Sequence, residues 1–339
     1  MYLLEDGGHV GPAEITCERY SKLAAFPKTK KRTVHDFRSH TNFKHSYSLL
    51  FDMKVVVVPA SAQTSQWAIQ TLLDDSSVPS VIGVYRDVGK VPAGFRNHQI
   101  FQAVQGDVSD GSTLDFSGCD AVITLTPPKL DGSDFIAFGK NMATNVRQAV
   151  AKSRSVKRLV YVSSQGAQYA EGVGEVVFVR NCYFMENWSS ALDTINSDNP
   201  YFYSTIAPLD YSLPMVSVKD IGKTCAREAL SAGTPLERSP RIVYLHGPRN
   251  FSVRDVWEAF EKVTGKKIRV ELVETEGLRR FFEHSPLPAN LVDDFVEMML
   301  TFLPGGLLEE EMNDLTNAVR GDDTLVDSFS RMWRASQSA

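Results

Sequence analysis

The stretch VVVVPASAQTSQWAIQTLL (residues 55–73) decides the fold, because it joins a short apolar run directly to an amphipathic segment. Consecutive valines are typical of a strand that is buried on both faces, as the strands of a parallel sheet are. The segment 66–73 carries apolar residues at helical spacing, so we expect a helix there. The apolar positions are Trp67, Ile69, Leu72 and Leu73.

The same alternation of apolar runs and amphipathic segments continues along the chain and predicts β-α-β units. Strands are expected at 80–85, 100–104, 121–125, 158–163 and 176–180, and helices at 133–152, 217–231 and 252–263. Further strands at 242–245 and 268–273 and helices at 276–284 and 288–303 indicate a small C-terminal lobe. We therefore predict an α/β fold with a Rossmann-like, doubly wound, mostly parallel sheet and a C-terminal α+β substrate lobe.

Three regions are expected along the 339 residues. Residues 1–52 have little periodicity, which indicates a loosely ordered extension or a gene model that starts upstream of the true first methionine. Residues 53–200 form the predicted Rossmann-like core, and residues 201–339 the substrate-binding lobe of the same domain.

Composition restricts the partners. The formal net charge of −5 argues against a nucleic-acid-binding surface, which requires a basic face, and favours a small-molecule substrate. The four cysteines show neither metal-site nor disulfide spacing, so no metal is expected and a reducing cytoplasm is the default. No apolar run approaches the ~20 residues of a membrane span, and the N-terminus does not have the pattern of a secretory signal.

One connection is unusually short. Only QGAQYAEGVGE (165–175) separates the predicted strands VYVSS (160–164) and VVFVR (176–180). A parallel crossover needs a dozen or more residues and usually contains a helix. Either this crossover is shortened, or the two strands are not parallel neighbours.

Several segments, in their linear order, resemble the NmrA-like group of atypical short-chain dehydrogenases. They are GVYRDVGK (83–90), QGDVSD (105–110), VKRLVYVSSQGA (156–167), RNCYFMENW (180–188), VSVKDIG (216–222) and RGDDTLVDSF (320–329). The resemblance covers about residues 53–329. It implies a doubly wound sheet with a C-terminal lobe that closes a substrate cleft.

The resemblance also implies an NADP site with an altered loop. Pro59, Ala62 and Ser65 occupy the three glycine positions of the family's dinucleotide loop, with Thr64 between the last two. Proline removes a backbone donor, Ala62 adds a Cβ where the pyrophosphate approaches, and Ser65 is small enough to pack and can cap the helix. We therefore expect weakened NADP binding.

The other cofactor-binding residues follow the second and third strands. The resemblance assigns Arg86, supported by Lys90, to the 2′-phosphate of NADP, because a guanidinium matches a phosphate in geometry and charge. It places Asp107 near the adenine, although an aspartate at this position can simply begin a turn.

The catalytic assignment is incomplete. Ser163 or Ser164 matches the superfamily's serine, and Tyr169 is the tyrosine nearest to it, but Val173 stands where the lysine of a Y-x-x-x-K pair would be. The resemblance places Tyr183, Phe184, Met185 and Trp188 beside the substrate, as lining of an apolar pocket, whereas such side chains are equally often core.

Three functions remain open. The first is an NADP-linked oxidoreductase that modifies an apolar molecule, as NmrA-like proteins of fungal secondary metabolism do. The second is a cyclase or isomerase that uses the cleft without a cofactor, and the altered loop favours it. The third is a non-enzymatic, redox-sensing regulator of the NmrA type.

Overall fold

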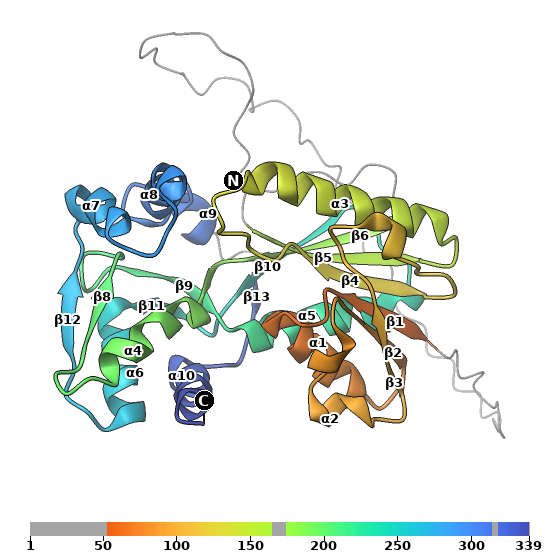
Figure 1. Ribbon diagram of the computed structural model, residues 1–339, viewed down its shortest axis with the longest axis horizontal. Coiled ribbons are helices and arrows are strands. Elements are labelled where there is room, and N and C mark those ends of the chain that lie inside the picture. Colours follow the sequence, from red (N-terminus) through yellow and green to blue (C-terminus); the bar gives the residue numbers. More distant parts are fainter. Residues whose placement is uncertain (1–52, 165–173, 314–317, 339) are drawn as a thin grey trace, which may run out of the picture. The chain divides into compact units, whose positions relative to one another are not determined.

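Eight parallel strands form the central sheet in the computed structural model, which describes residues 53–164, 174–313 and 318–338. Their order is β13-β10-β6-β5-β4-β1-β2-β3, and Figure 1 shows the sheet from one side. The strands are β1 (Lys54–Val58), β2 (Ser80–Tyr85), β3 (Phe101–Gln105), β4 (Ala121–Leu125), β5 (Arg158–Ser164), β6 (Glu175–Asn181), β10 (Arg241–His246) and β13 (Val319–Arg320). The predicted Rossmann-like parallel sheet is confirmed. Residues 1–52 lie outside the described part of the chain.

The valine run of β1 is buried on both faces, as the sequence predicts. Val55 and Val57 join one core with residues of α1 (Gln63–Leu73) and α5 (Val218–Leu230). Val56 and Val58 join a second core with residues of α3 (Phe135–Lys152). In Figure 1, α3 lies above the sheet and α1 and α5 lie below it. None of the described helices is long and apolar enough to cross a membrane.

The short connection joins two parallel neighbours. β5 and β6 pair in parallel register, with Arg158 opposite Glu175 and Ser164 opposite Asn181. The chain must therefore return over the length of a seven-residue strand, about 20 Å, using only residues 165–174. A helix covering that distance needs about 13 residues, because it rises only about 1.5 Å per residue. Of the two alternatives left open by the sequence, the crossover is therefore the shortened one, and residues 165–173 lie outside the described part of the chain.

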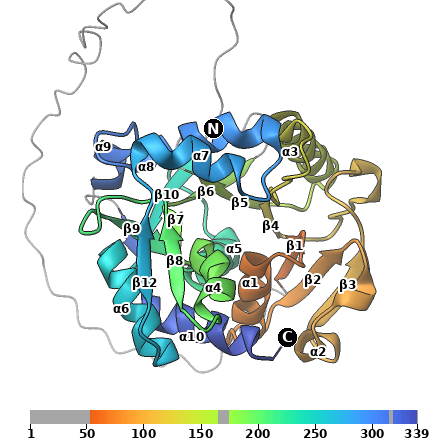
Figure 2. The ribbon, with the colours of Figure 1, turned by 60° about the vertical axis from the view of Figure 1, so that its left-hand side comes forward.

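The C-terminal lobe contains two small sheets and several helices. Strands β7 (Tyr183–Phe184), β9 (Ser212–Val216) and β11 (Asn250–Ser252) form one sheet, and β8 (Tyr201–Ser204) pairs with β12 (Arg269–Leu272) in the other (Figure 2). The helices are α4 (Leu192–Ile195), α6 (Val253–Thr264), α7 (Leu278–Glu283), α8 (Val292–Phe302), α9 (Glu309–Asn313) and α10 (Leu325–Ser336). The lobe core is aromatic: Phe202 contacts Phe260, which stacks on Phe329 with ring centroids 4.1 Å apart. The lobe thus takes β7 and α4 from before residue 200, and the segment after residue 200 also supplies α5, β10 and β13 to the sheet region.

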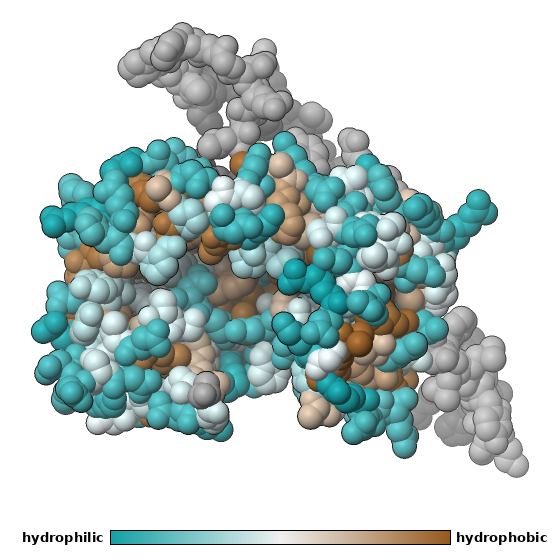
Figure 3. Space-filling model, in the orientation of Figure 1, coloured by the Kyte–Doolittle hydropathy of each residue, from teal (hydrophilic) through white to brown (hydrophobic). Residues whose placement is uncertain are grey.

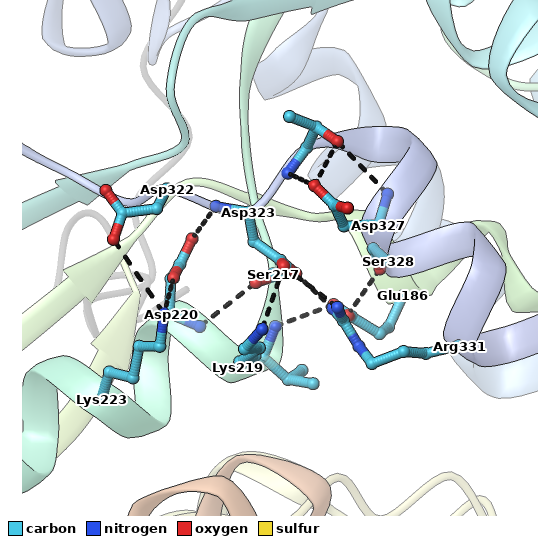
Figure 4. Close-up of polar contacts among 12 residues, drawn as sticks. Glu186, Ser217, Lys219, Asp220, Lys223, Asp322, Asp323, Asp327, Ser328 and Arg331 are labelled. Carbon is cyan, nitrogen blue, oxygen red and sulfur yellow. Dashed lines mark hydrogen bonds and ion pairs between the residues drawn. The ribbon is translucent and has the colours of Figure 1, made fainter. Parts of the chain in front are cut away.

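Three of the family-like segments meet in one polar network (Figure 4). Glu186, in the 3₁₀ helix η3 (Met185–Ala191), accepts hydrogen bonds from the Val218 amide (2.9 Å) and the Ser328 hydroxyl (2.8 Å). Burial raises the pKa of this carboxyl. Asp323 is buried and pairs with Arg331 of α10 and with Lys219 of α5, whose Nζ lies 3.5 Å away. The network fastens α10 and η3 to the first turn of α5.

Close contact between α1 and α5 requires glycine at position 222. A Cβ added there would lie 2.6 Å from the Ala68 amide nitrogen and 2.7 Å from the Thr64 carbonyl oxygen. We expect Gly222→Ala to lower the free energy of unfolding by about 1–3 kcal/mol, because backbone atoms of α1 would have to move. Urea unfolding measures this. Gly94→Ala, whose added Cβ meets nothing within 4 Å, is the control, and equal effects in both variants would contradict the packing argument.

Candidate functional site

The carboxyl ends of the central strands bring the predicted site residues to one edge of the sheet. Because the neighbours are parallel, this edge carries in order Asp107 after β3, Arg86 after β2, the 59–65 loop after β1, and Ser163 at the end of β5. Strand order reverses between β1 and β4, and open α/β sheets bind ligands at such a switch point. Sequence positions more than 100 residues apart thus form one candidate site.

The 59–65 loop keeps its shape without glycine. Ala62 has φ −66° and ψ 145°, an extended conformation open to any residue, and Ser65 lies within the first turn of α1. Among the described non-glycine residues only Val78 has positive φ, so none of the three replaced glycine positions requires left-handed backbone. Pro59 follows a cis peptide bond, and the Ala60 amide donates to the Val84 carbonyl (2.8 Å). The three replacements therefore change the space left for a ligand and the number of backbone N–H donors in the loop. They do not change the backbone conformation that the loop needs.

The first turn of α1 presents open amides. The first backbone hydrogen bond at this end runs from Gln66 to Ala62, and within the described part of the chain the amides of Gln63, Thr64 and Ser65 have no acceptor. No side chain caps the helix, and α1 begins three residues earlier than predicted. The expectation that Ser65 caps the helix is wrong, because Ser65 lies inside the first turn with its hydroxyl buried and unpaired.

The other two long helices that cover the sheet close their N-termini with protein groups. Asp134 caps α3 through the Ala137 amide (2.8 Å). The Ser217 side chain caps α5 by accepting a hydrogen bond from the Asp220 amide, and the Glu186 carboxylate accepts one from the Val218 amide. Three unpaired amides and the positive end of the helix dipole make the α1 N-terminus the suitable place for an anion.

Arg86 and Lys90, which the resemblance assigns to the 2′-phosphate of NADP, follow β2, and this assignment stays a prediction. Both are exposed just beyond β2, and neither side chain forms a hydrogen bond or ion pair with a described residue. Asp107 accepts from the Ser109 amide (2.8 Å), so it does begin a turn, and its assignment to the adenine stays a prediction. The open amides, the buried Thr64 and Ser65 and the unpaired Arg86 are compatible with a bound dinucleotide.

The other half of the edge carries hydroxyl groups. Ser163 is buried at the end of β5, beside Arg180 in register. On the neighbouring strand, Thr126 follows β4, and its hydroxyl is hydrogen-bonded to that of Tyr161. Sequence reasoning missed this pair, because only the strand register shows that the two residues meet. Ser164 ends β5, while Tyr169 lies outside the described residues.

The residues assigned to a substrate pocket lie in the C-terminal lobe. Met185 and Trp188 are buried in its core, which favours the alternative that the sequence left open. Tyr183 and Phe184 are half-buried, and the Tyr183 ring lies edge-on to Phe302, with centroids 5.8 Å apart. Figure 3 shows apolar residues in the hollow at the centre of one face of the molecule. Pocket lining by Tyr183 and Phe184 stays a prediction.

A separate groove of about 840 Å³ runs between α6 and β12, where Trp257 and Ile268 contribute to its lining. None of its lining residues belongs to the strand-end edge, so it is not part of the candidate site. The described residues contain no group of three side chains that could hold a metal ion.

Comparisons with known proteins agree with this geometry. Residues 60–191 match a family model described as NAD(P)H-binding. No curated protein matches the sequence. Among solved structures, the fold is similar to the quinone oxidoreductase QOR2 of Escherichia coli in complex with NADPH, with 17% identity, a TM-score of 0.61, and coverage of 83% of this chain and 100% of that one.

Two further solved structures are a reductase and a regulator. The triphenylmethane reductase of Citrobacter sp. has 14% identity and a TM-score of 0.59, with coverage of 83% of this chain and 99% of that one. NmrA, a negative transcriptional regulator in complex with NADP, has 14% identity and a TM-score of 0.54, with coverage of 84% of this chain and 92% of that one. The structural neighbours thus include NmrA and related NAD(P)-binding proteins, which confirms the expected resemblance.

Proposed function

We propose that the protein is an NADP(H)-dependent reductase of an apolar small molecule, of the kind that a tailoring enzyme of fungal secondary metabolism would modify. The observation that carries the proposal is the uncapped N-terminus of α1 at the switch point, with the unpaired Arg86 beyond the neighbouring strand. The match of residues 60–191 to an NAD(P)H-binding model supports it.

Each part of the edge has a role in this proposal. The open amides of α1 hold the pyrophosphate, and Arg86 with Lys90 holds the 2′-phosphate. The nicotinamide half then lies over β4, β5 and β6, because a dinucleotide crosses the switch point. When bound, the cofactor supplies hydride, while the protein orients the substrate and excludes water.

Arg86 should select NADPH over NADH. Arg86→Ala is expected to weaken NADPH binding by about 10- to 100-fold and leave NADH binding nearly unchanged, because only NADPH carries the 2′-phosphate that the guanidinium would hold. Isothermal titration calorimetry of the purified protein measures both affinities. Arg154→Ala removes an exposed arginine at the opposite edge of the sheet and should change neither.

The titration also separates the alternatives. No heat at millimolar NADPH would eliminate the reductase proposal and favour a cofactor-free cyclase or isomerase, which the proline and alanine of the 59–65 loop support. Micromolar binding without turnover would favour a redox-sensing regulator, supported by the similarity to NmrA. Two structural neighbours suggest the test acceptors: a quinone and a cationic triphenylmethane dye.

A further inference from the structure

From the middle of β5, the Tyr161 side chain reaches the carboxyl end of β4, where its hydroxyl meets that of Thr126. Tyr161 lies opposite Thr124 in the parallel register, and Thr126 is two residues further along the same chain, on the same side of the sheet. The Tyr161 hydroxyl is hydrogen-bonded to the Thr126 Oγ1. Ser163, two residues beyond Tyr161, lies on that same side. This places the phenol at the edge where the nicotinamide half of the cofactor is proposed to lie.

The phenol is held rigidly. Tyr161 is half-buried within a central strand, not on a loop, and its ring packs edge-on against Phe178 of β6 with centroids 6.1 Å apart. Thr126 is followed by two prolines, which limit the backbone freedom of the next residues. A group that transfers a proton must be positioned to within hydrogen-bond distance of its target, and this setting meets that requirement.

The chain lacks the usual Y-x-x-x-K pair. Position 173 is valine where a Y-x-x-x-K pair would have lysine, so Tyr169 lacks its lysine partner. A phenol gives up its proton more readily than an aliphatic hydroxyl, so of the two hydroxyls at this edge Tyr161 is the better acid.

We propose that Tyr161 is the catalytic proton donor of carbonyl reduction and that Thr126 positions it. The inference rests on the reductase function proposed above. A bound NADPH would supply hydride to the carbonyl carbon of the substrate. As the carbon–oxygen π bond breaks, the carbonyl oxygen would take the Tyr161 proton and become a hydroxyl group. The Thr126 hydroxyl donates to the phenolate that develops, and water returns the proton afterwards.

Two acceptors with different proton requirements test this role. A quinone must gain hydride and a proton, whereas a cationic triphenylmethane dye accepts hydride at its central carbon and needs no proton. With NADPH saturating, Tyr161→Phe should lower kcat for 1,4-naphthoquinone by about 10²-fold relative to kcat for the dye, because general acid catalysis is worth about 10²-fold or more. Thr126→Val should lower the same ratio by about 3- to 10-fold, as expected for one lost hydrogen bond.

Tyr203→Phe is the matched control, because it removes a phenol hydroxyl from a side chain that is 50% exposed in the lobe. Its quinone-to-dye ratio should equal that of the wild type. NADPH affinity and the thermal unfolding midpoint, measured for every variant, show whether each one is folded and binds cofactor. A Tyr161→Phe ratio equal to that of the wild type would overturn the role of Tyr161 while leaving the reductase proposal intact. Wild-type protein that binds NADPH but reduces neither acceptor would overturn the reductase proposal and, with it, this inference.

Discussion

Arg158→Ala is expected to lower the free energy of unfolding by about 2–4 kcal/mol, because a buried guanidinium would be lost together with its hydrogen bonds, and those to charged groups contribute about 1.5–3 kcal/mol each. The Arg158 side chain is only 1% exposed at the start of β5. Its Nη2 lies 2.6 Å from the Glu175 carboxylate and 2.6 Å from the Thr234 carbonyl oxygen, and its Nη1 donates to Ser231 and to the Glu228 carbonyl at the end of α5. The substitution would remove all four of these hydrogen bonds, although the Glu228 carbonyl would keep the Ser231 hydroxyl and the Glu175 carboxylate the Leu236 amide.

Lys157→Ala is the matched control in the next residue. Lys157 pairs with Asp120 at 2.8 Å, but its side chain is 51% exposed. Exposed pairs contribute at most about 1 kcal/mol, so this variant should unfold within about 1 kcal/mol of the wild type. Guanidinium chloride titration followed by circular dichroism measures both. If Arg158→Ala and Lys157→Ala lost equal free energies of unfolding, burial of the Arg158 side chain would not explain its contribution to stability.

The protein should lose stability as the pH falls from about 6.5 to 4 because of His246. This side chain, at the end of β10, is fully buried, and among the described residues neither ring nitrogen has a hydrogen-bond partner. Burial, and secondarily the nearby Arg320, lowers its pKa to about 4. The unfolded chain binds a proton below pH 6.5 that the folded state binds only near pH 4. His246 therefore does not reduce the free energy of unfolding above pH 6.5. Between pH 6.5 and pH 4 it lowers this free energy by about 3 kcal/mol.

The pH dependence of unfolding, compared between variants, isolates this histidine. His246→Gln should flatten the decline between pH 7 and pH 5, even if it lowers stability overall, because the titrating group is gone. His98→Gln removes an exposed histidine and should leave the slope unchanged. If the slopes of His246→Gln and the wild type agree, His246 does not control acid stability.

Local pattern was sufficient for much of the fold. The strands of the sheet core and the long helices α3, α5 and α6 lie close to their predicted ranges, because period and apolar content are local properties. The strands β7, β8, β9, β11 and β13 were missed, because none of them carries the run of valine, isoleucine and leucine that marks β1 and β4. Their strand conformation comes from partners that the fold brings beside them.

The first half of the candidate site was also visible in the sequence. Arg86 and the 59–65 loop follow predicted strands, and parallel strands end at one edge. What the sequence left open was the backbone conformation of the loop, and the described backbone shows that none of the three replaced glycine positions requires left-handed angles.

By itself, the sequence determined the Rossmann-like class, the position of the 59–65 loop between the first strand and helix, and the absence of a Y-x-x-x-K pair, because these depend on residue type and local spacing. Only the tertiary structure decided that β5 and β6 are parallel neighbours, that α1 has an uncapped N-terminus, and that Tyr161 meets Thr126. The physical reason is that strand register and helix packing arise from contacts between residues far apart in the chain, which no single segment contains.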